Sequence, residues 1–165
     1  VKHANPCGVS SKNDHLESYK SALSCDPISA FGGIVSCNFK ITKNLALELN
    51  KLFLEVIIAN GFESSAIKIL KAKKNLRLID GTNYTSEELL KFVSFNQNIM
   101  IQSEDLNLFS TKNFKIVSKR KPTSKQLKDL IFAFNVCRYV KSNAIVLASN
   151  ETTIGIGSGL SLIHI

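Results

Sequence analysis

Residues 34–59 read IVSCNFKITKNLALELNKLFLEVIIA, and this stretch decides the fold class. Residues 34–37 are a short apolar run that predicts a strand, and residues 55–59 predict a second, buried strand with a carboxylate at its start. Between them, a helix is expected after Thr42. Its expected apolar side consists of Leu45, Ala46, Leu49, Leu52 and Phe53. The order strand, helix, strand indicates an α/β layered domain with substantial parallel sheet.

Local signals extend this alternation along the chain. Asp14 followed by Glu17, and Thr123 followed by Gln126, are capping-box patterns that predict helix starts. The helix after Thr123 has the longest apolar rhythm, with hydrophobic residues every three to four positions. The expected helices run from Asp14 to before Asp26, over 63–73, and from Thr123 to 141–143. The expected strands are 76–79, 98–102, 116–118, 144–148 and 153–157, with helix and loop both left open for 80–97.

Length and composition set the broad class. With 165 residues and 44% hydrophobic content, the chain is long enough for one domain, or part of one, with a real core. It has no run of about 18 apolar residues, which argues against a membrane span. Its four cysteines lack C-x-x-C spacing and are expected to be reduced thiols in a cytoplasmic protein. The chain begins with Val1 rather than Met, which suggests a fragment.

The formal net charge of +8 would suit a polyanionic partner. However, 18 of the 21 basic residues are lysine, whereas nucleic-acid readers usually use arginine forks and clustered basic stripes. The basic clusters at 71–74 and 119–121 are not interleaved with aromatic residues. A solvated surface is therefore favoured over a nucleic-acid-binding module, and an anionic small-molecule substrate is also consistent with this charge.

The first eight residues carry the strongest candidate for chemistry. Lys2 and His3 stand side by side, directly before a turn-forming Asn5-Pro6 and Gly8. Because proline and glycine restrict or redirect the backbone, the pair is expected on a stiff, sharply turned segment. Histidine can accept a proton near neutral pH, and lysine can stabilise developing negative charge. This combination suits acyl-type transfer; the alternative is an exposed dipeptide at the chain terminus.

Two further motifs leave alternatives open. Gly32-Gly33 could let backbone amides approach a ligand, or could simply form a tight turn. His15-Leu16-Glu17 matches the H-x-E of zinc deaminases, but Pro6-Cys7 precedes it, in the wrong order. A metal site is not expected, and a deaminase-like hydrolase would have to contain zinc.

Several strings occur together in one order and spacing. They are the segments 2–8 (KHANPCG), 26–35 (DPISAFGGIV), 53–59 (FLEVIIA), 73–77 (KKNLR), 140–146 (VKSNAIV) and 153–159 (TIGIGSG). Over residues 1–159 the chain closely resembles the transformylase part of the bacterial AICAR transformylase/IMP cyclohydrolase family of purine biosynthesis. The combination is highly specific, although each string alone would be weak.

The resemblance implies transfer of a formyl group from 10-formyltetrahydrofolate, a cosubstrate, to the 5-amino group of the ribonucleotide AICAR. It implies that His3 accepts the proton and that Lys2 stabilises the transition state. It assigns nucleotide contacts to Gly32, Glu55 and Asn143, with Asn143 also counted among the catalytic residues. The implied fold has α/β layers with a mixed sheet, like the cytidine deaminase fold without its metal.

The resemblance also implies a division of the chain and a larger assembly. Residues 1–159 would be a truncated transformylase domain, and residues 160–165 an atypical tail, with Ile163 where the family has a folate-contacting arginine. The cyclohydrolase domain and the last third of the transformylase would lie outside the chain. The family works as a cytoplasmic homodimer on small molecules, with no membrane or nucleic-acid partner. The alternative is an inactive or non-catalytic fragment of the same family.

Overall fold

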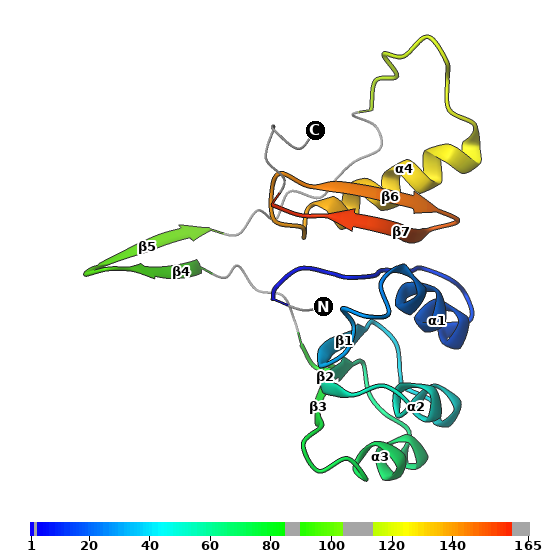
Figure 1. Ribbon diagram of the computed structural model, residues 1–165, viewed down its shortest axis with the longest axis vertical. Coiled ribbons are helices and arrows are strands. Elements are labelled where there is room, and N and C mark those ends of the chain that lie inside the picture. The colour runs from blue at the N-terminus through cyan, green and yellow to red at the C-terminus, as the bar shows by residue number, and fades with distance from the viewer. Residues whose placement is uncertain (2, 85–89, 104–113, 160–165) are drawn as a thin grey trace. The chain divides into compact units, whose positions relative to one another are not determined.

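The structure is a computed structural model that describes residues 1, 3–84, 90–103 and 114–159 (Figure 1). It divides into two compact units, Val1–Thr82 with Val117–Ile165, and Asn83–Ile116. The helices of the described residues are α1 (His15–Cys25), α2 (Lys43–Leu49), α3 (Ser64–Leu70) and α4 (Ser124–Cys137). The strands are β1 (Gly33–Cys37), β2 (Leu54–Ala59), β3 (Arg77–Asp80), β4 (Leu90–Phe95), β5 (Asn98–Ser103), β6 (Ile145–Ser149) and β7 (Thr152–Gly157).

The first unit contains a three-stranded parallel sheet in the order β1-β2-β3. Val35 is aligned with Ile57, and Ile57 with Leu78. The helices α2 and α3 connect successive strands, so the region is a pair of β-α-β crossovers. The expected α/β fold with a parallel sheet is therefore confirmed, whereas the likeness to the cytidine deaminase fold stays a prediction.

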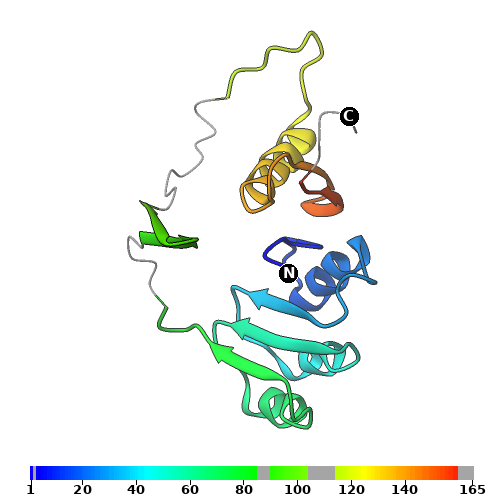
Figure 2. The same ribbon diagram turned by 60° about the vertical axis from the view of Figure 1, so that its left-hand side comes forward.

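The hydrophobic core lies where α2 and α3 cover one side of this sheet (Figures 1 and 2). Ile57 and Ala59 alternate along β2 and are almost fully buried, as expected for the covered face. Thr42 caps α2 by accepting a hydrogen bond from the Leu45 N–H. The other buried members of the cluster are Tyr19, Ile41, Leu45, Ala46, Leu49, Leu54, Ala66 and Leu70.

The second part of this unit is the antiparallel hairpin β6-β7, with α4 packed against β6. The capping box of α4 is confirmed in both directions, between Thr123 and Gln126. Asn150 and Glu151 have positive φ angles of 52° and 51°, which suits the tight turn of a two-residue hairpin. The apolar rhythm of α4 is not fully buried, since Leu130 and Phe134 are about half exposed.

Several expectations about local structure are wrong. The helices expected over 63–73 and from Thr123 to 141–143 end earlier, at Leu70 and Cys137. The helix after Thr42 ends at Leu49, so Leu52 and Phe53 lie beyond its end, and Phe53 is 45% exposed. Residues 116–118 form no strand, because Val117 is 85% exposed and pairs with no neighbouring strand among the described residues. Part of the ambiguous stretch 80–97 is β4, which pairs with β5.

The buried face of α2 can be tested with two leucines of the same helix. Leu49 is 1% exposed and Leu47 is 49% exposed. We expect Leu49→Ala to lower the free energy of unfolding by about 2–5 kcal/mol, because it leaves a cavity in the core. Leu47→Ala should cost less than about 1 kcal/mol. Equal losses of unfolding free energy in the two variants, measured by urea unfolding, would contradict the placement of Leu49 in the core.

Candidate functional site

The segment before α1 forms a strand-like extension of the β6-β7 hairpin. The Thr153 N–H donates to the Val9 carbonyl at 2.9 Å, and the Val9 N–H donates to the Thr153 Oγ1 at 2.9 Å. The Ser11 N–H donates to the Glu151 carbonyl, also at 2.9 Å. Thr153 is 2% exposed, whereas Val9 is partly buried and Ser11 is exposed. The amino-terminal segment is thus fixed to β7.

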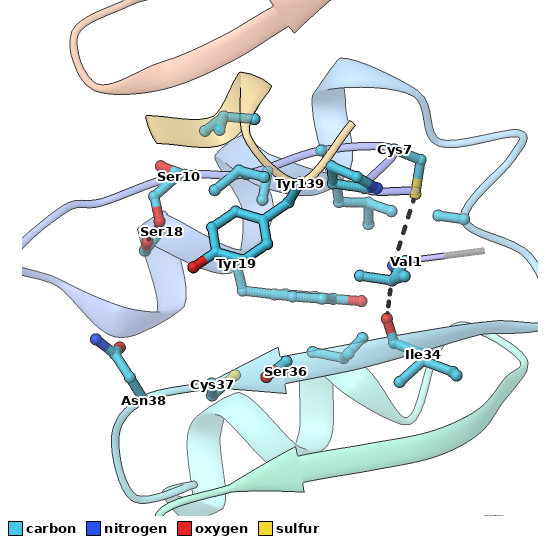
Figure 3. A pocket seen from close by; sticks show the side chains of 18 of the residues that line it. Val1, Cys7, Ser10, Ser18, Tyr19, Ile34, Ser36, Cys37, Asn38 and Tyr139 are labelled. Atoms are coloured by element: carbon cyan, nitrogen blue, oxygen red, sulfur yellow. Dashed lines mark hydrogen bonds between the residues drawn. The ribbon is translucent and has the colours of Figure 1, made fainter. Parts of the chain in front are cut away.

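The same segment is fixed at its other end to the edge of β1. The Ile34 N–H donates to the Val1 carbonyl at 2.9 Å, and the Val1 nitrogen donates to the Ile34 carbonyl at 2.7 Å (Figure 3). Two residues that exchange both backbone hydrogen bonds form an antiparallel pair. The start of the chain is therefore held beside the first residues of the parallel sheet.

Between these two anchors the backbone turns sharply. His3 and Ala4 have positive φ angles of 53° and 63°, a region that residues other than glycine rarely adopt. His3 is exposed. The expectation of a sharply turned segment is confirmed for His3, whereas Lys2 lies outside the described residues.

Asn143 is exposed and follows a loop that is joined directly to this turn. The Lys141 N–H donates to the Asn5 Oδ1 at 2.8 Å, across 136 positions of sequence. The Lys141 carbonyl accepts from the Gly159 N–H at 2.9 Å. The Ser142–Asn143 peptide bond is cis. His3 and Asn143 therefore each lie two residues from the Asn5–Lys141 hydrogen bond.

Gly32 and Glu55 lie at the amino ends of neighbouring parallel strands. Gly32 has a φ of 67°, and its N–H donates to the Phe53 carbonyl at 2.9 Å. The Gly33 N–H donates to the Ala30 carbonyl at 3.1 Å. Both glycine amides are engaged within the chain, which favours the tight-turn interpretation of this pair. Glu55 is exposed at the start of β2.

Two distant segments are bonded directly to the first five residues of the chain, and a third is bonded to one of these two. The Val1–Ile34 pair brings in the start of β1, and the Gly32–Phe53 bond brings in the start of β2. The Asn5–Lys141 bond brings in the loop that carries Asn143. Hydrogen bonds thus link the segments of His3, Gly32 and Asn143, and Glu55 lies two residues beyond Phe53 on the strand beside Gly32. These four residues are the candidate site.

A cavity of about 920 Å³ lies beside this site, between the amino-terminal segment, α1, β1 and α4 (Figure 3). Its lining is largely apolar and includes Ala4, Tyr19, Ile34, Cys37, Val136 and Tyr139. His3, Gly32, Glu55 and Asn143 are not among its lining residues. These four candidate residues therefore lie outside the lining of the cavity.

Two ionisable groups of the cavity wall are held neutral at physiological pH. Burial raises the pKa of the Tyr19 hydroxyl to about 12, with smaller contributions from the charge of Glu48 and, at high pH, from the ionised Cys37 thiol. Burial also raises the pKa of the Cys37 thiol to about 11. Because the thiolate is the reactive form of cysteine, Cys37 is a packing residue rather than a nucleophile.

Asn5 contributes to the arrangement of this site, and its local sequence pattern does not identify that role. It was interpreted only as part of a turn-forming Asn-Pro, although its side chain reaches Lys141. A signal was present, because asparagine can donate and accept at once, but no local pattern identifies a partner 136 positions away.

Neither a candidate metal site nor a membrane-spanning helix occurs among the described residues. Within 1, 3–84, 90–103 and 114–159, no group of three or more His, Cys, Asp or Glu side chains could hold a metal ion. In the same residues, no helix has the length and apolar character needed to cross a membrane.

The chain is similar to known proteins of one family over nearly its whole length. The family model of the AICARFT/IMPCHase bienzyme matches residues 1–161. The bifunctional purine biosynthesis protein PurH of Buchnera aphidicola subsp. Schizaphis graminum is 48% identical over 161 residues, or 96% of this chain. PurH of Rhodospirillum rubrum is 45% identical over 161 residues, and PurH of Caldicellulosiruptor saccharolyticus 42% over 160 residues, each again over 96% of this chain. The chain spans about 31% of the length of each of these relatives.

The fold is an α/β segment with a parallel sheet, in which a turned amino-terminal segment carries His3. The chain belongs to the AICARFT/IMPCHase bienzyme family. The expected family is therefore confirmed.

The Tyr19 hydroxyl provides a test of the cavity wall. It is buried and has no hydrogen-bond partner in the part of the chain that the structure describes. Tyr19→Phe should therefore raise the free energy of unfolding by about 1 kcal/mol at pH 7. Above pH 10 the unfolded tyrosine ionises while the folded one stays protonated until about pH 12, so the wild type loses stability over this range. The Tyr19→Phe variant should lose less stability than the wild type over this pH range.

Tyr139→Phe is the matched control, because Tyr139 lines the same cavity but is 73% exposed. Urea unfolding at pH 7 and pH 11 measures both effects. If Tyr19→Phe lowered stability at pH 7, the hydroxyl would have a partner and this description would be wrong.

Proposed function

We propose that this chain is the part of a longer enzyme that transfers a formyl group from 10-formyltetrahydrofolate to the 5-amino group of AICAR. The amine nitrogen attacks the formyl carbon, and the bond from that carbon to N10 of the folate breaks. The amine loses a proton and N10 gains one. The product is formyl-AICAR, an intermediate of purine biosynthesis.

This reaction needs two kinds of help from the protein. The amine is a poor nucleophile because its lone pair is drawn into the ring and the carboxamide, so a proton acceptor must lie beside it. The tetrahedral intermediate carries an oxyanion, so a cation or hydrogen-bond donor must lie beside the former carbonyl oxygen.

We assign the proton acceptor to His3 and the oxyanion stabiliser to Lys2. His3 is exposed on a backbone turn that is anchored on both sides, at Val1 and at Asn5. A fixed position of this kind supports catalysis, because a proton acceptor works only within hydrogen-bond reach of the reacting nitrogen.

Asn143, Gly32 and Glu55 complete the proposed site. The amide of Asn143 can accept from the substrate carboxamide and donate to the formyl oxygen. Glu55 offers a carboxylate to the nucleotide from the start of β2. Since the Gly32 N–H is already bonded to Phe53, we propose that Gly32 acts through its carbonyl or through the close approach of its backbone.

The observation that supports this proposal is the set of hydrogen bonds that join the start of β1 and the Asn143 loop to the two sides of the His3 turn. The proposal extends to the longer protein: a cytoplasmic homodimer whose active site lies between subunits, with the IMP cyclohydrolase reaction carried out outside this segment. The folate acts as cosubstrate, and the proposed chemistry requires no metal. Residues 1–159 are proposed as the transformylase portion, and 160–165 as an atypical tail.

The roles of Lys2 and His3 can be tested in a chimaera. In this chimaera, the present chain replaces the 161 residues that it matches in the Buchnera relative. Each of Lys2→Ala and His3→Ala should lower kcat for formyl-AICAR formation by at least about 100-fold, because each removes a group needed in the transition state. Steady-state kinetics with AICAR and 10-formyltetrahydrofolate measures the change.

His15→Ala is the matched control. His15 stacks on Phe39, with ring centroids 3.7 Å apart, and takes no part in the proposed site. It should change stability but leave kcat within about twofold. An effect of His3→Ala confined to KM would count against its role as proton acceptor, and an unsubstituted chimaera without transformylase activity would refute the proposed function.

A further inference from the structure

We infer that Asn5 is a positioning residue that holds the turn of His3 and the loop of Asn143 in one fixed arrangement. This inference rests on the proposed function, because it concerns the two groups that the proposal places on either side of the formyl transfer. Asn5 itself does not touch the reacting atoms.

The Asn5 side chain makes two hydrogen bonds that fix its orientation. Its Oδ1 accepts from the Lys141 N–H at 2.8 Å, and its Nδ2 donates to the His3 carbonyl at 3.4 Å. Both partners have fixed polarity, since a backbone N–H only donates and a carbonyl only accepts. This fixes the orientation of the amide, because the flipped amide would oppose like groups on both sides.

One of these two bonds is local in sequence, and the other reaches a distant segment of the chain. The bond to His3 is local, as in many Asn-containing turns. The bond to Lys141 crosses 136 positions and reaches the loop between α4 and β6. Lys141 is held from its other side by Gly159, so its peptide group is a fixed point to which the turn is tied.

The backbone of the His3 turn is strained and is held from both sides. His3 and Ala4 have positive φ angles, a conformation that is strained for residues other than glycine and persists only where surrounding contacts impose it. Val1 is held by Ile34 on one side of this turn, and Asn5 holds the other side. Loss of the Asn5 amide frees that second side, and the His3 backbone can then relax.

Catalysis depends on the exact position of His3 and Asn143 relative to the substrate. A displacement of about 1 Å of a catalytic group can lower the rate about 100-fold, even when the substrate still binds. Asparagine is suited to this position because it supplies one acceptor and one donor. Aspartate keeps the acceptor for Lys141 and lacks the donor, whereas leucine of similar size has neither.

The experiment uses the chimaera and separates kcat from KM. We expect Asn5→Leu to lower kcat by about 30-fold or more while KM for AICAR changes by less than about threefold, because misplaced groups affect the transition state most. Asn5→Asp should retain more activity, with kcat about 3–10-fold below the unsubstituted chimaera, because one of two bonds is kept. If Asn5→Leu does not fold, Asn5→Asp decides the result.

Asn60→Leu is the matched control. The Asn60 Nδ2 donates to the Asn38 carbonyl at 3.1 Å, a similar bond at the other end of the parallel sheet. It should lower the melting temperature without lowering kcat. A kcat for Asn5→Asp equal to that of the unsubstituted chimaera, or equal losses of kcat in Asn5→Leu and Asn60→Leu, would overturn the inference. Either result leaves the proposed function standing, whereas an inactive unsubstituted chimaera overturns both.

Discussion

The structure of the first unit depends on the double attachment of the chain's first eleven residues. At one end Val1 exchanges both backbone hydrogen bonds with Ile34, at the edge of the parallel sheet. At the other end Val9 is bonded to Thr153 of β7, and Ser11 to Glu151 in the turn of the hairpin. A parallel sheet and an antiparallel hairpin distant in sequence are thereby joined by one segment. The buried Thr153 at the second attachment makes this a fixed junction rather than a surface contact.

This junction also explains where the candidate chemistry lies. The turn at His3 is held between the two attachments, and the Asn143 loop is drawn to it by Asn5. Gly32 and Glu55 lie at the amino ends of β1 and β2, whereas ligands of open α/β sheets usually bind at the carboxyl ends. Tyr19 and Cys37 line the neighbouring apolar cavity, and their raised pKa values make them unsuited to proton transfer at neutral pH.

The sequence predicted what depends on local patterns. Periodicity and caps identified the parallel β-α-β region and α4 because burial of one helix or strand face repeats along the chain. The same rhythm overran the end of α2, since Leu52 and Phe53 continue the apolar pattern after the helix has stopped at Leu49. The bonds from Gly32 to Phe53 and from Asn5 to Lys141 could not be predicted, because they join positions that only the folded chain brings together.

The most direct test of this account is a crystal structure of the full-length chimaera with AICAR bound. The account predicts that the 5-amino group lies within hydrogen-bond distance of the His3 imidazole and that Asn143 contacts the carboxamide. It also predicts that the Asn5 amide still bridges His3 and Lys141 in the complex. AICAR bound in the apolar cavity between α1 and α4, with His3 and Asn143 out of contact, would contradict it.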